Sequence, residues 1–495
     1  MRRFASFATS SIPAGSTSRD DLPRMTDRAA DAPALARTLT LRDLVLFNIV
    51  AVMSIRWLAT SAAAGPGSLV LWVLAGVFFF VPQGLAVADL AARHPEEGGI
   101  YRWTRRAFGE GHGFLCGWCY WVNNVLYYPS LLLFIASIAP WAFGAGESGL
   151  SERWSYLLPV TLGGMWLAVG VNILGVRTGQ RLQNLGGMAA FVPGGLIIAL
   201  GIYAFFTHEP ATAITAAALV PGAQDLSRLN FWASIAFAYA GLELSATLAG
   251  EIKDPARSLP RAVMITAPII VTVYVVSTAS LLWMIPSDQL NVVTAIMQGI
   301  AAGVRDLPAL AWVVPLAAAA ITLHVLGSVG AWLSGSARVG FAVGLDRYAP
   351  PAFARVHPRW GTPYVAMLVQ ATLSTVFLLI SVLGRGTGAE AAYLVLLDTM
   401  LLVYFVPYVY LFLCYVAAGS GRERAGAGGR AWRWCVGVSG LLVTLFAMFV
   451  ACVPPPDTSY HVLKVVGGAV GFVLLGGLLY WRAARREPAT VGEAA

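Results

Sequence analysis

The chain has 495 residues, of which 58% are hydrophobic and only 12% are charged, and its mean hydropathy is +0.70. Soluble globular domains carry about 25% charged residues, so this composition leaves too little polar surface to keep so large a fold in water. The low number of cysteines (five) and the lack of any tract of low hydropathy exclude a disulfide scaffold and a disordered chain. The sequence therefore predicts an all-α membrane protein, and we interpret its net charge of +8 as a sign of membrane orientation rather than of a nucleic-acid partner.

The first 40 residues contain arginines together with four aspartates, and they include no continuous apolar stretch. A secretory signal peptide needs such a stretch, and transit peptides are poor in acids. We therefore expect a disordered cytoplasmic tail over 1–40, and a second cytoplasmic tail over 483–495.

Twelve segments are long and apolar enough to cross a bilayer, which takes about 20 residues per helix. In chain order they lie near 42–62, 68–92, 111–139, 154–174, 186–206, 228–250, 260–285, 308–336, 363–384, 391–416, 432–452 and 461–482. An even number of spans places both termini on one side of the membrane.

Lysine and arginine are distributed very unevenly between the two sides of these spans. Counted with the adjoining ends of the spans, the side that holds the termini carries 27 of the 33, the opposite side carries five, and Arg56 alone lies well inside a span. Because basic residues concentrate in cytoplasmic loops, this split predicts that both termini are cytoplasmic in a cell inner membrane. The split also supports the count of twelve, because one missed span would move every later loop to the other side and remove the difference in charge.

Few ionisable residues lie within the spans, and each is a candidate for function because charge is costly in hydrocarbon. They are Arg56, Asp89, Glu243, Asp398 and, as the one intramembrane histidine, His324. Asp89 is close enough to the end of its span to reach the interface. The other charged residues lie deeper.

Polar residues or glycine interrupt the first and sixth spans midway. Ser54 and Arg56 interrupt the first, and Gly241 and Glu243 interrupt the sixth. Interrupted helices at corresponding positions of two halves indicate a transport site, because unwound backbone exposes N–H and C=O groups to a substrate. The alternative is helix-packing glycine with a buried Arg56–Glu243 ion pair, and composition alone does not decide between the two.

Cys116 and Cys119 form a C-x-x-C pair inside an apolar span, without a second pair or a histidine nearby. Metal sites of this type need further ligands, so ordinary packing is the favoured interpretation. We expect no metal and no cofactor.

Four motifs follow one another in a fixed order along the chain. The segment 88–101 reads A-D-L-A…P-E-E-G-G-I-Y, and 239–255 reads Y-A-G-L-E…E-I-K-D-P. The segment 326–346 begins L-G-S-V-G-A-W, and 350–363 ends in G-T-P. Together they resemble the amino acid–polyamine–organocation transporter superfamily over nearly all of 40–480, and most closely its bacterial glutamate/γ-aminobutyrate and arginine/agmatine antiporters.

The resemblance implies a fold of two five-helix repeats with inverted topology, over 41–206 and 228–416, followed by two extra helices over 432–482. In that fold helices 1 and 6 are unwound around a central site. It implies a secondary active transporter that moves amino acids or related amines by alternating access, as a monomer or a homodimer.

Five residues match positions to which the family assigns a role. The resemblance implies that Asn124 contacts the substrate, that Phe237 lies over it and that Trp332 closes the inner side of the site. It implies that Glu243 acts in gating and in the response to pH, and that Tyr404 assists gating, in a register that can shift by one helical turn. Ordinary core packing is the alternative for the two aromatic residues Phe237 and Trp332.

At the helix breaks, the resemblance implies that Ala51, Ala240 and Gly241 border the substrate. The family's usual Gly-x-Gly in helix 1 is missing here, so Ser54 or Arg56 is expected to bind through its side chain.

Two charges point to different substrates. A bidentate contact from Arg56 would favour an anionic amino acid, whereas Asp398 would favour an amine. The two charges could also neutralise each other.

Proton-coupled members of the superfamily that the chain resembles can carry a lysine on helix 5, but the matching region 188–191 has none, and helix 8 shows no obvious serine/threonine pair for sodium. The resemblance therefore favours exchange over ion-coupled symport. Other classes fit less well. A membrane-embedded enzyme would need clustered ligands or a triad, yet the six histidines are scattered. A channel would show repeated pore segments, and a nutrient sensor on this fold would show large soluble domains.

Overall fold

The computed structural model divides the chain into two units, Met1–Ala34 and Leu35–Ala495, and all residues described below belong to the second. The structure describes residues 37–96, 98–146, 148–220, 226–290, 294–346, 348–383, 389–418, 427–453 and 461–485. The two predicted tails therefore lie outside the described residues, except for 37–40 and 483–485.

Helices make up nearly all of the described chain, and its one bridge between extended segments joins Leu39 to Ile252. The long helices and helix pairs are α1 (Leu41–Val52) with α2 (Arg56–Ala63), α3 (Gly67–Ala75) with α4 (Val81–Arg93), α6 (Glu110–Ile138), α7 (Trp154–Ile173), α8 (Val176–Ala189) with α9 (Phe191–Thr207), α11 (Leu226–Ala238) with η4 (Leu242–Glu251), α12 (Pro255–Met284), α14 (Val313–Leu345), α15 (Tyr364–Leu383), α16 (Ala389–Ala418), α17 (Ala427–Ala451) and α18 (His461–Ala484). The short elements are η1 (Gly76–Phe80), α5 (Ile100–Phe108), η2 (Ala139–Phe143), η3 (Leu150–Glu152), α10 (Ala216–Leu219), η5 (Ser287–Gln289), α13 (Ala295–Gly303), η6 (Pro308–Leu310) and η7 (Pro351–Ala354).

The number of membrane-length helices is close to the prediction. Within the described residues, ten helices are long and apolar enough to cross a membrane, and the bent pair α1–α2 makes eleven. The helix α15 covers the predicted ninth span, and its described part includes the apolar stretch Tyr364–Leu379. The all-helical membrane class is confirmed, and the count of twelve stays a prediction.

Both predicted helix breaks are present. The helices α1 and α2 meet at an angle of 41°, with Met53 in a non-helical conformation between them. In the sixth span, α11 ends at Ala238, and the chain resumes at Leu242 as the 3₁₀ helix η4. The turn between them contains Gly241 at φ 129°, a conformation that residues with a Cβ rarely adopt.

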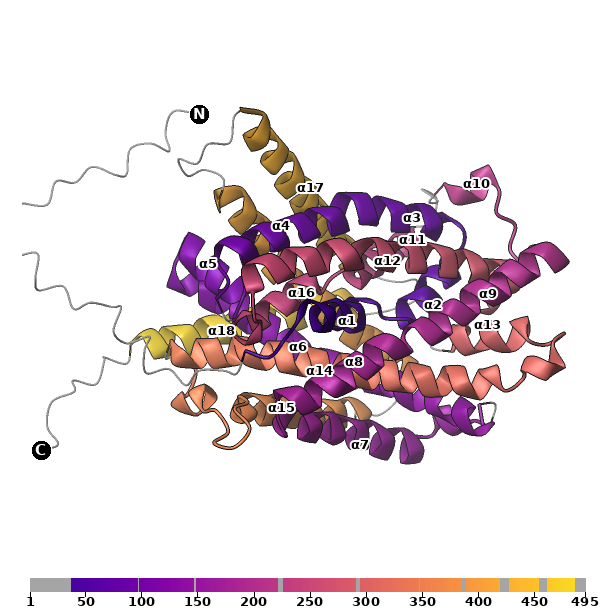
Figure 1. The fold of residues 1–495 in the computed structure, drawn as a ribbon, viewed down its shortest axis with the longest axis horizontal. Coiled ribbons are helices and arrows are strands. Elements are labelled where there is room, and N and C mark those ends of the chain that lie inside the picture. Colours follow the sequence, from indigo (N-terminus) through magenta and orange to yellow (C-terminus); the bar gives the residue numbers. More distant parts are fainter. Residues whose placement is uncertain are drawn as a thin grey trace, which may run out of the picture. The chain divides into compact units, whose positions relative to one another are not determined.

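The broken helices occupy the interior of the bundle. In Figure 1, α1 lies between α12 on one side and α8 and α14 on the other, and it contacts all three. The helix η4 is almost wholly buried, and so is the second half of α1, from Leu46 to Val52. Their central place allows the two breaks to meet.

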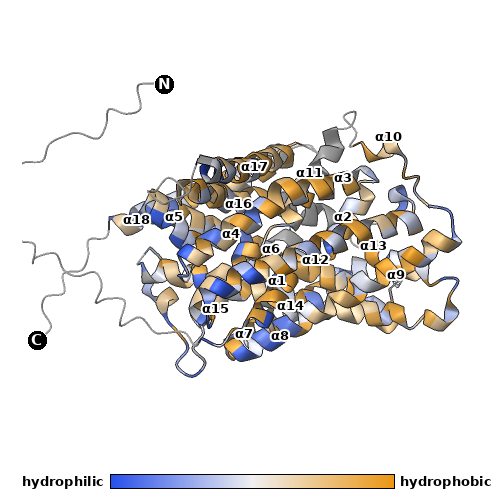
Figure 2. Ribbon diagram, turned by 45° about the horizontal axis from the view of Figure 1, so that its top comes forward, coloured by the Kyte–Doolittle hydropathy of each residue, from blue (hydrophilic) through white to orange (hydrophobic). Residues whose placement is uncertain are grey.

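Peripheral helices expose large apolar side chains. Leu442 and Phe449 on α17 and Leu474 on α18 are each at least 60% exposed, and Figure 2 shows that hydrophobic residues dominate these ribbons. Such exposure would be unfavourable in water, so these faces contact lipid.

Two glycines allow α8 and α14 to cross in direct backbone contact. A Cβ added to Gly186 would lie 2.9 Å from the Cα of Gly327, and one added to Gly327 would lie equally close to Gly186. This crossing lies beside α1, because a Cβ on Gly187 would lie 2.7 Å from the carbonyl oxygen of Leu46.

Candidate functional site

The two helix breaks are linked by the hydroxyl of Tyr274 on α12. It accepts a hydrogen bond from the backbone N–H of Ser54 (3.0 Å) and lies within bonding distance of the carbonyl oxygens of Val52 (2.7 Å) and Ala238 (3.1 Å). A hydroxyl has one proton, so it donates to one of these carbonyls at a time. Backbone groups freed by both breaks therefore share one buried polar partner.

Glu243 lies beside the break of the sixth span and is fully buried. Its Oε1 accepts hydrogen bonds from the hydroxyls of Tyr404 (2.6 Å) and Tyr120 (3.1 Å). Its Oε2 accepts from Gln83 Nε2 (3.1 Å), from the N–H of Gly241 (3.2 Å) and from the hydroxyl of Tyr408. Five neutral donors from four different segments thus surround one carboxylate.

The alternative of a buried Arg56–Glu243 ion pair is wrong. Among the ion pairs of the described residues, none involves Glu243, and all its hydrogen bonds come from uncharged donors. Neutral donors can stabilise a buried carboxylate through charge-assisted hydrogen bonds, without a cation.

Arg56 is the first residue of α2, and its side chain points toward α6. The guanidinium carbon lies 4.4 Å from the ring centroid of Trp57 and 5.0 Å from that of Tyr127, and Nη1 donates to Ser130 Oγ at 3.1 Å. A cation over two aromatic faces is favourable even after it has lost its hydration. Arg56 is 1% exposed, so it is a desolvated positive charge beside the first break.

An aromatic cluster joins the surroundings of Arg56 to those of Glu243. Phe237 makes edge contacts with Trp57 (5.4 Å), Tyr127 (6.2 Å) and Tyr404 (5.2 Å). Trp332 makes edge contacts with the same Tyr127 (5.3 Å) and Tyr404 (5.7 Å). The cluster therefore brings together residues from α2, α6, α11, α14 and α16.

Trp332 is also tied to both breaks. Its Nε1 donates to the carbonyl oxygen of Ala51 at 3.0 Å. A Cβ added to Gly241 would lie 3.2 Å from its Cζ2 and 3.2 Å from Val52 Cγ2. The indole thus packs closely between the unwound segments.

Two consecutive amides on α6 leave polar atoms without a partner. Asn124 donates from Nδ2 to the carbonyl oxygen of Tyr120 at 2.8 Å, but its Oδ1 has no hydrogen-bond partner among the described residues. Asn123 is fully buried, and in the same part of the chain neither atom of its amide has a partner. Because most buried polar groups in native proteins are bonded, such atoms are candidates to bind a ligand.

The remaining candidates have separate environments. Ala240 lies in the break, where its N–H donates to the carbonyl oxygen of Phe237 (2.9 Å). The side chain of Asp398 lies outside the described residues. Asp89 pairs with Arg93 (3.0 Å) and Arg433 (2.9 Å), as expected for a group at the interface.

His324 lies at the glycine crossing of α8 and α14. Its Nδ1 is 3.1 Å from the carbonyl oxygen of Gly186. It is not part of the aromatic cluster.

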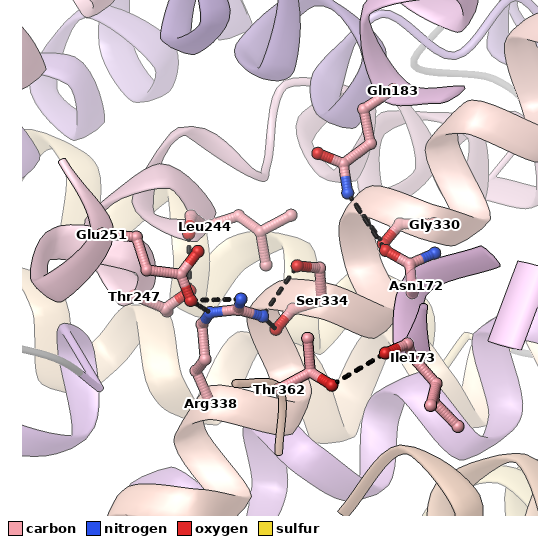
Figure 3. A network of polar contacts seen from close by, with 10 residues as sticks. All are labelled: Asn172, Ile173, Gln183, Leu244, Thr247, Glu251, Gly330, Ser334, Arg338 and Thr362. Carbon is pink, nitrogen blue, oxygen red and sulfur yellow. Dashed lines mark hydrogen bonds and ion pairs between the residues drawn. The ribbon is translucent and has the colours of Figure 1, made fainter. Parts of the chain in front are cut away.

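A second polar network lies at the far end of η4 (Figure 3). Arg338 Nε donates to Glu251 Oε1 at 2.6 Å, and Arg338 Nη1 donates to the carbonyl oxygen (2.6 Å) and hydroxyl (2.7 Å) of Ser334. Both charged side chains are at most 1% exposed. The carbonyl oxygen of Glu251 also accepts from the N–H groups of Thr38 and Leu39, just before α1.

The position of Arg338 corrects the sequence analysis, which ended the eighth span at 336 and counted this arginine in a loop. The helix α14 continues to Leu345, and Arg338 is buried inside it. An arginine is tolerated there because its charge is paired with Glu251 and its guanidinium group also donates a hydrogen bond to the hydroxyl of Ser334.

The profile of the amino acid permease family matches residues 39–474. The chain belongs to the amino acid permease family. A serine/threonine exchanger of Bacillus subtilis is 29% identical over 342 residues, which cover 65% of this chain and 71% of the exchanger. A glutamate/gamma-aminobutyrate antiporter of Lactococcus lactis is 25% identical over 394 residues, covering 77% of each chain.

The same fold occurs in a solved structure. The crystal structure of MhsT in complex with L-phenylalanine superposes with a TM-score of 0.63 at 14% identity, covering 84% of this chain and 99% of MhsT. This permease is accordingly a multi-pass membrane transporter of the amino acid class and not an enzyme, as the sequence predicted.

The structure brings most of the predicted site residues into one connected region. Their shared partners were not predicted: they are Gln83, Tyr120, Tyr127, Ser130, Tyr274 and Tyr408. The sequence feature that could have identified them is that each carries a hydroxyl or amide group within an apolar span. The one-turn shift allowed for Tyr404 leads to Tyr408, and both residues contact Glu243.

Proposed function

We propose that this permease exchanges an amino acid or a related amine across the membrane by alternating access. The observation that carries the proposal is the meeting of two broken helices at a buried carboxylate held by five neutral donors. Exchange is also supported by the relatives named as an exchanger and an antiporter.

The substrate carboxylate is proposed to bind at Arg56. This residue combines a buried guanidinium with the N-terminus of α2, where the helix dipole is positive. Its planar donors suit a carboxylate, and a second carboxylate on the substrate side chain would strengthen the preference. We therefore favour an amino acid with an acidic side chain.

Other parts of the substrate are proposed to contact the surrounding residues. Phe237 and Trp332 supply apolar faces, and Asn124 supplies a free carbonyl oxygen. Backbone groups of the breaks are contributed by Ala51, Ser54, Ala240 and Gly241. The substrate amine is assigned to Asp398.

Glu243, Trp332 and Tyr404 are proposed to form the gate. An ionised carboxylate only accepts hydrogen bonds, whereas a protonated one must also donate. Protonation of Glu243 therefore forces at least one of its donors to turn away, which loosens α16 and α6 from the sixth span. Opening is then favoured at acid pH.

The topology is proposed to follow the predicted repeats, 41–206 and 228–416, with two further helices over 432–482. The distribution of basic residues supports an inner-membrane protein with both termini in the cytoplasm. The functional unit is a monomer or a homodimer.

Counterflow into proteoliposomes tests the proposal. Vesicles preloaded with glutamate should take up labelled glutamate much faster than empty vesicles, and basic or neutral amino acids should compete less well. Arg56→Lys keeps the positive charge but loses the planar guanidinium group that can donate two hydrogen bonds to one carboxylate. The variant should therefore raise the KM for glutamate while the yield of folded protein stays unchanged. Uptake that needs a proton gradient and no internal substrate would instead show the alternative, proton-coupled symport.

A further inference from the structure

A basic pocket of about 370 Å³ lies at the end of the bundle where α1 begins and η4 ends. Three separate segments line it: Arg37 precedes α1, Lys253 follows η4, and Arg177 and Arg181 are on α8. Like charges repel when they gather around one cavity, so such an arrangement is favourable mainly when an anion occupies the cavity.

Within the described part of the chain, the acidic side chain in this pocket, Asp43, forms no ion pair with these cations. Asp43 accepts hydrogen bonds from Thr40 N (2.9 Å) and Oγ1 (2.6 Å) and from Asn184 Nδ2 (3.0 Å), all of them uncharged donors. Across the described residues, neither of the two arginines on α8 nor Arg37 or Lys253 has a carboxylate within ion-pair distance. Four positive charges therefore remain available to one ligand.

The surface next to the pocket is apolar. Leu185 and Met188 follow Arg181 at helical spacing on α8, and they are 51% and 50% exposed. Along this face of α8, two exposed arginines are thus followed by two exposed apolar side chains. A ligand with a charged head and an apolar tail matches this sequence of surfaces better than a free anion does.

We propose that this pocket binds the phosphate headgroup of an anionic phospholipid, with an acyl chain along Leu185 and Met188. Arginine pairs well with phosphate oxygens, and basic pockets between helices at a membrane surface suit such headgroups. A bound headgroup would also contact Thr38 and Lys253, which line the pocket and are the chain neighbours of the bridged residues Leu39 and Ile252. The lipid would thereby hold the ends of both broken helices to α8.

Native mass spectrometry of the purified full chain, titrated with phosphatidylglycerol or phosphatidylcholine in detergent, tests this site. The wild type should bind phosphatidylglycerol more tightly than phosphatidylcholine. Each basic residue near anionic lipid contributes about 1 kcal/mol, so Arg177→Gln/Arg181→Gln should raise the Kd for phosphatidylglycerol roughly thirtyfold. Arg257→Gln removes an exposed arginine that does not line the pocket, and it should leave the Kd unchanged.

Two controls keep the result decisive. Lys253→Gln changes a different segment and should weaken binding by roughly fivefold, even if the double variant folds poorly. Inorganic phosphate at equal concentration should not displace the lipid. Unchanged affinity in the α8 double variant or in Lys253→Gln, or equal competition by inorganic phosphate, would overturn the proposal. The assay requires no transport, so its outcome is independent of the proposed exchange.

Discussion

Glu243 and Glu251 are buried carboxylates on the same helix, η4, yet they are stabilised in different ways. Glu251 faces a cation, Arg338, whereas Glu243 faces only hydroxyl and amide donors. Protonation of Glu251 would leave a buried cation without its counterion, which is strongly unfavourable. Protonation of Glu243 leaves no such charge behind. Glu251 is therefore suited to hold structure, and Glu243 is the carboxylate that the proposed gate uses.

The largest effect is expected at the ion pair. Arg338→Met leaves Glu251 buried without its cation, which should destabilise the protein by about 3–5 kcal/mol. The midpoint of thermal unfolding in detergent measures this loss. Because Glu251→Leu added to Arg338→Met removes both charges, the double variant should recover much of the stability. A single variant as stable as the wild type would contradict the structural role of the pair.

A smaller effect is expected from one donor to Glu243. Tyr408→Phe removes a hydrogen bond to a charged group, a loss of about 1.5–3 kcal/mol. Tyr239→Phe is a matched control, because its buried hydroxyl donates to the carbonyl oxygen of Trp72 and its loss should cost about 1 kcal/mol. Equal unfolding midpoints in the two variants would show that Glu243 is not charged when the donors surround it.

The smallest loss of stability is expected at the helix break. Gly241→Ala places a Cβ in a positive-φ conformation, which costs about 1–2 kcal/mol, and brings it 3.2 Å from Trp332. Gly361→Ala also places a Cβ at positive φ (62°), but no atom lies within 4 Å of the new Cβ. Exchange should slow only in Gly241→Ala. If exchange slowed equally in both variants, the contact with Trp332 would not be the cause, and Trp332 would have no role in gating.

Hydropathy and charge pattern were sufficient to predict the helical class and the two breaks, and the resemblance of four motifs indicated the family. Gly241 and Glu243 were visible because glycine and acid are rare inside an apolar span. The partners of Glu243 were not predicted, because Gln83, Tyr120 and Tyr408 come from three different helices and only packing brings them together. Arg338 was misplaced for a similar reason: a hydropathy window ends a helix at a charge, and the buried partner that tolerates this charge is distant in sequence.

The pH dependence of exchange in Glu243→Gln tests the central claim most directly. The glutamine keeps the size of the side chain but cannot change its protonation state. We predict that wild-type exchange accelerates from neutral to acid pH and that the variant, folded and active, shows no such acceleration. Glu251→Gln is the control, and it should lose stability while the active fraction keeps the wild-type pH profile. If Glu243→Gln retains the wild-type pH profile, Glu243 is not the titrating group and the account is contradicted.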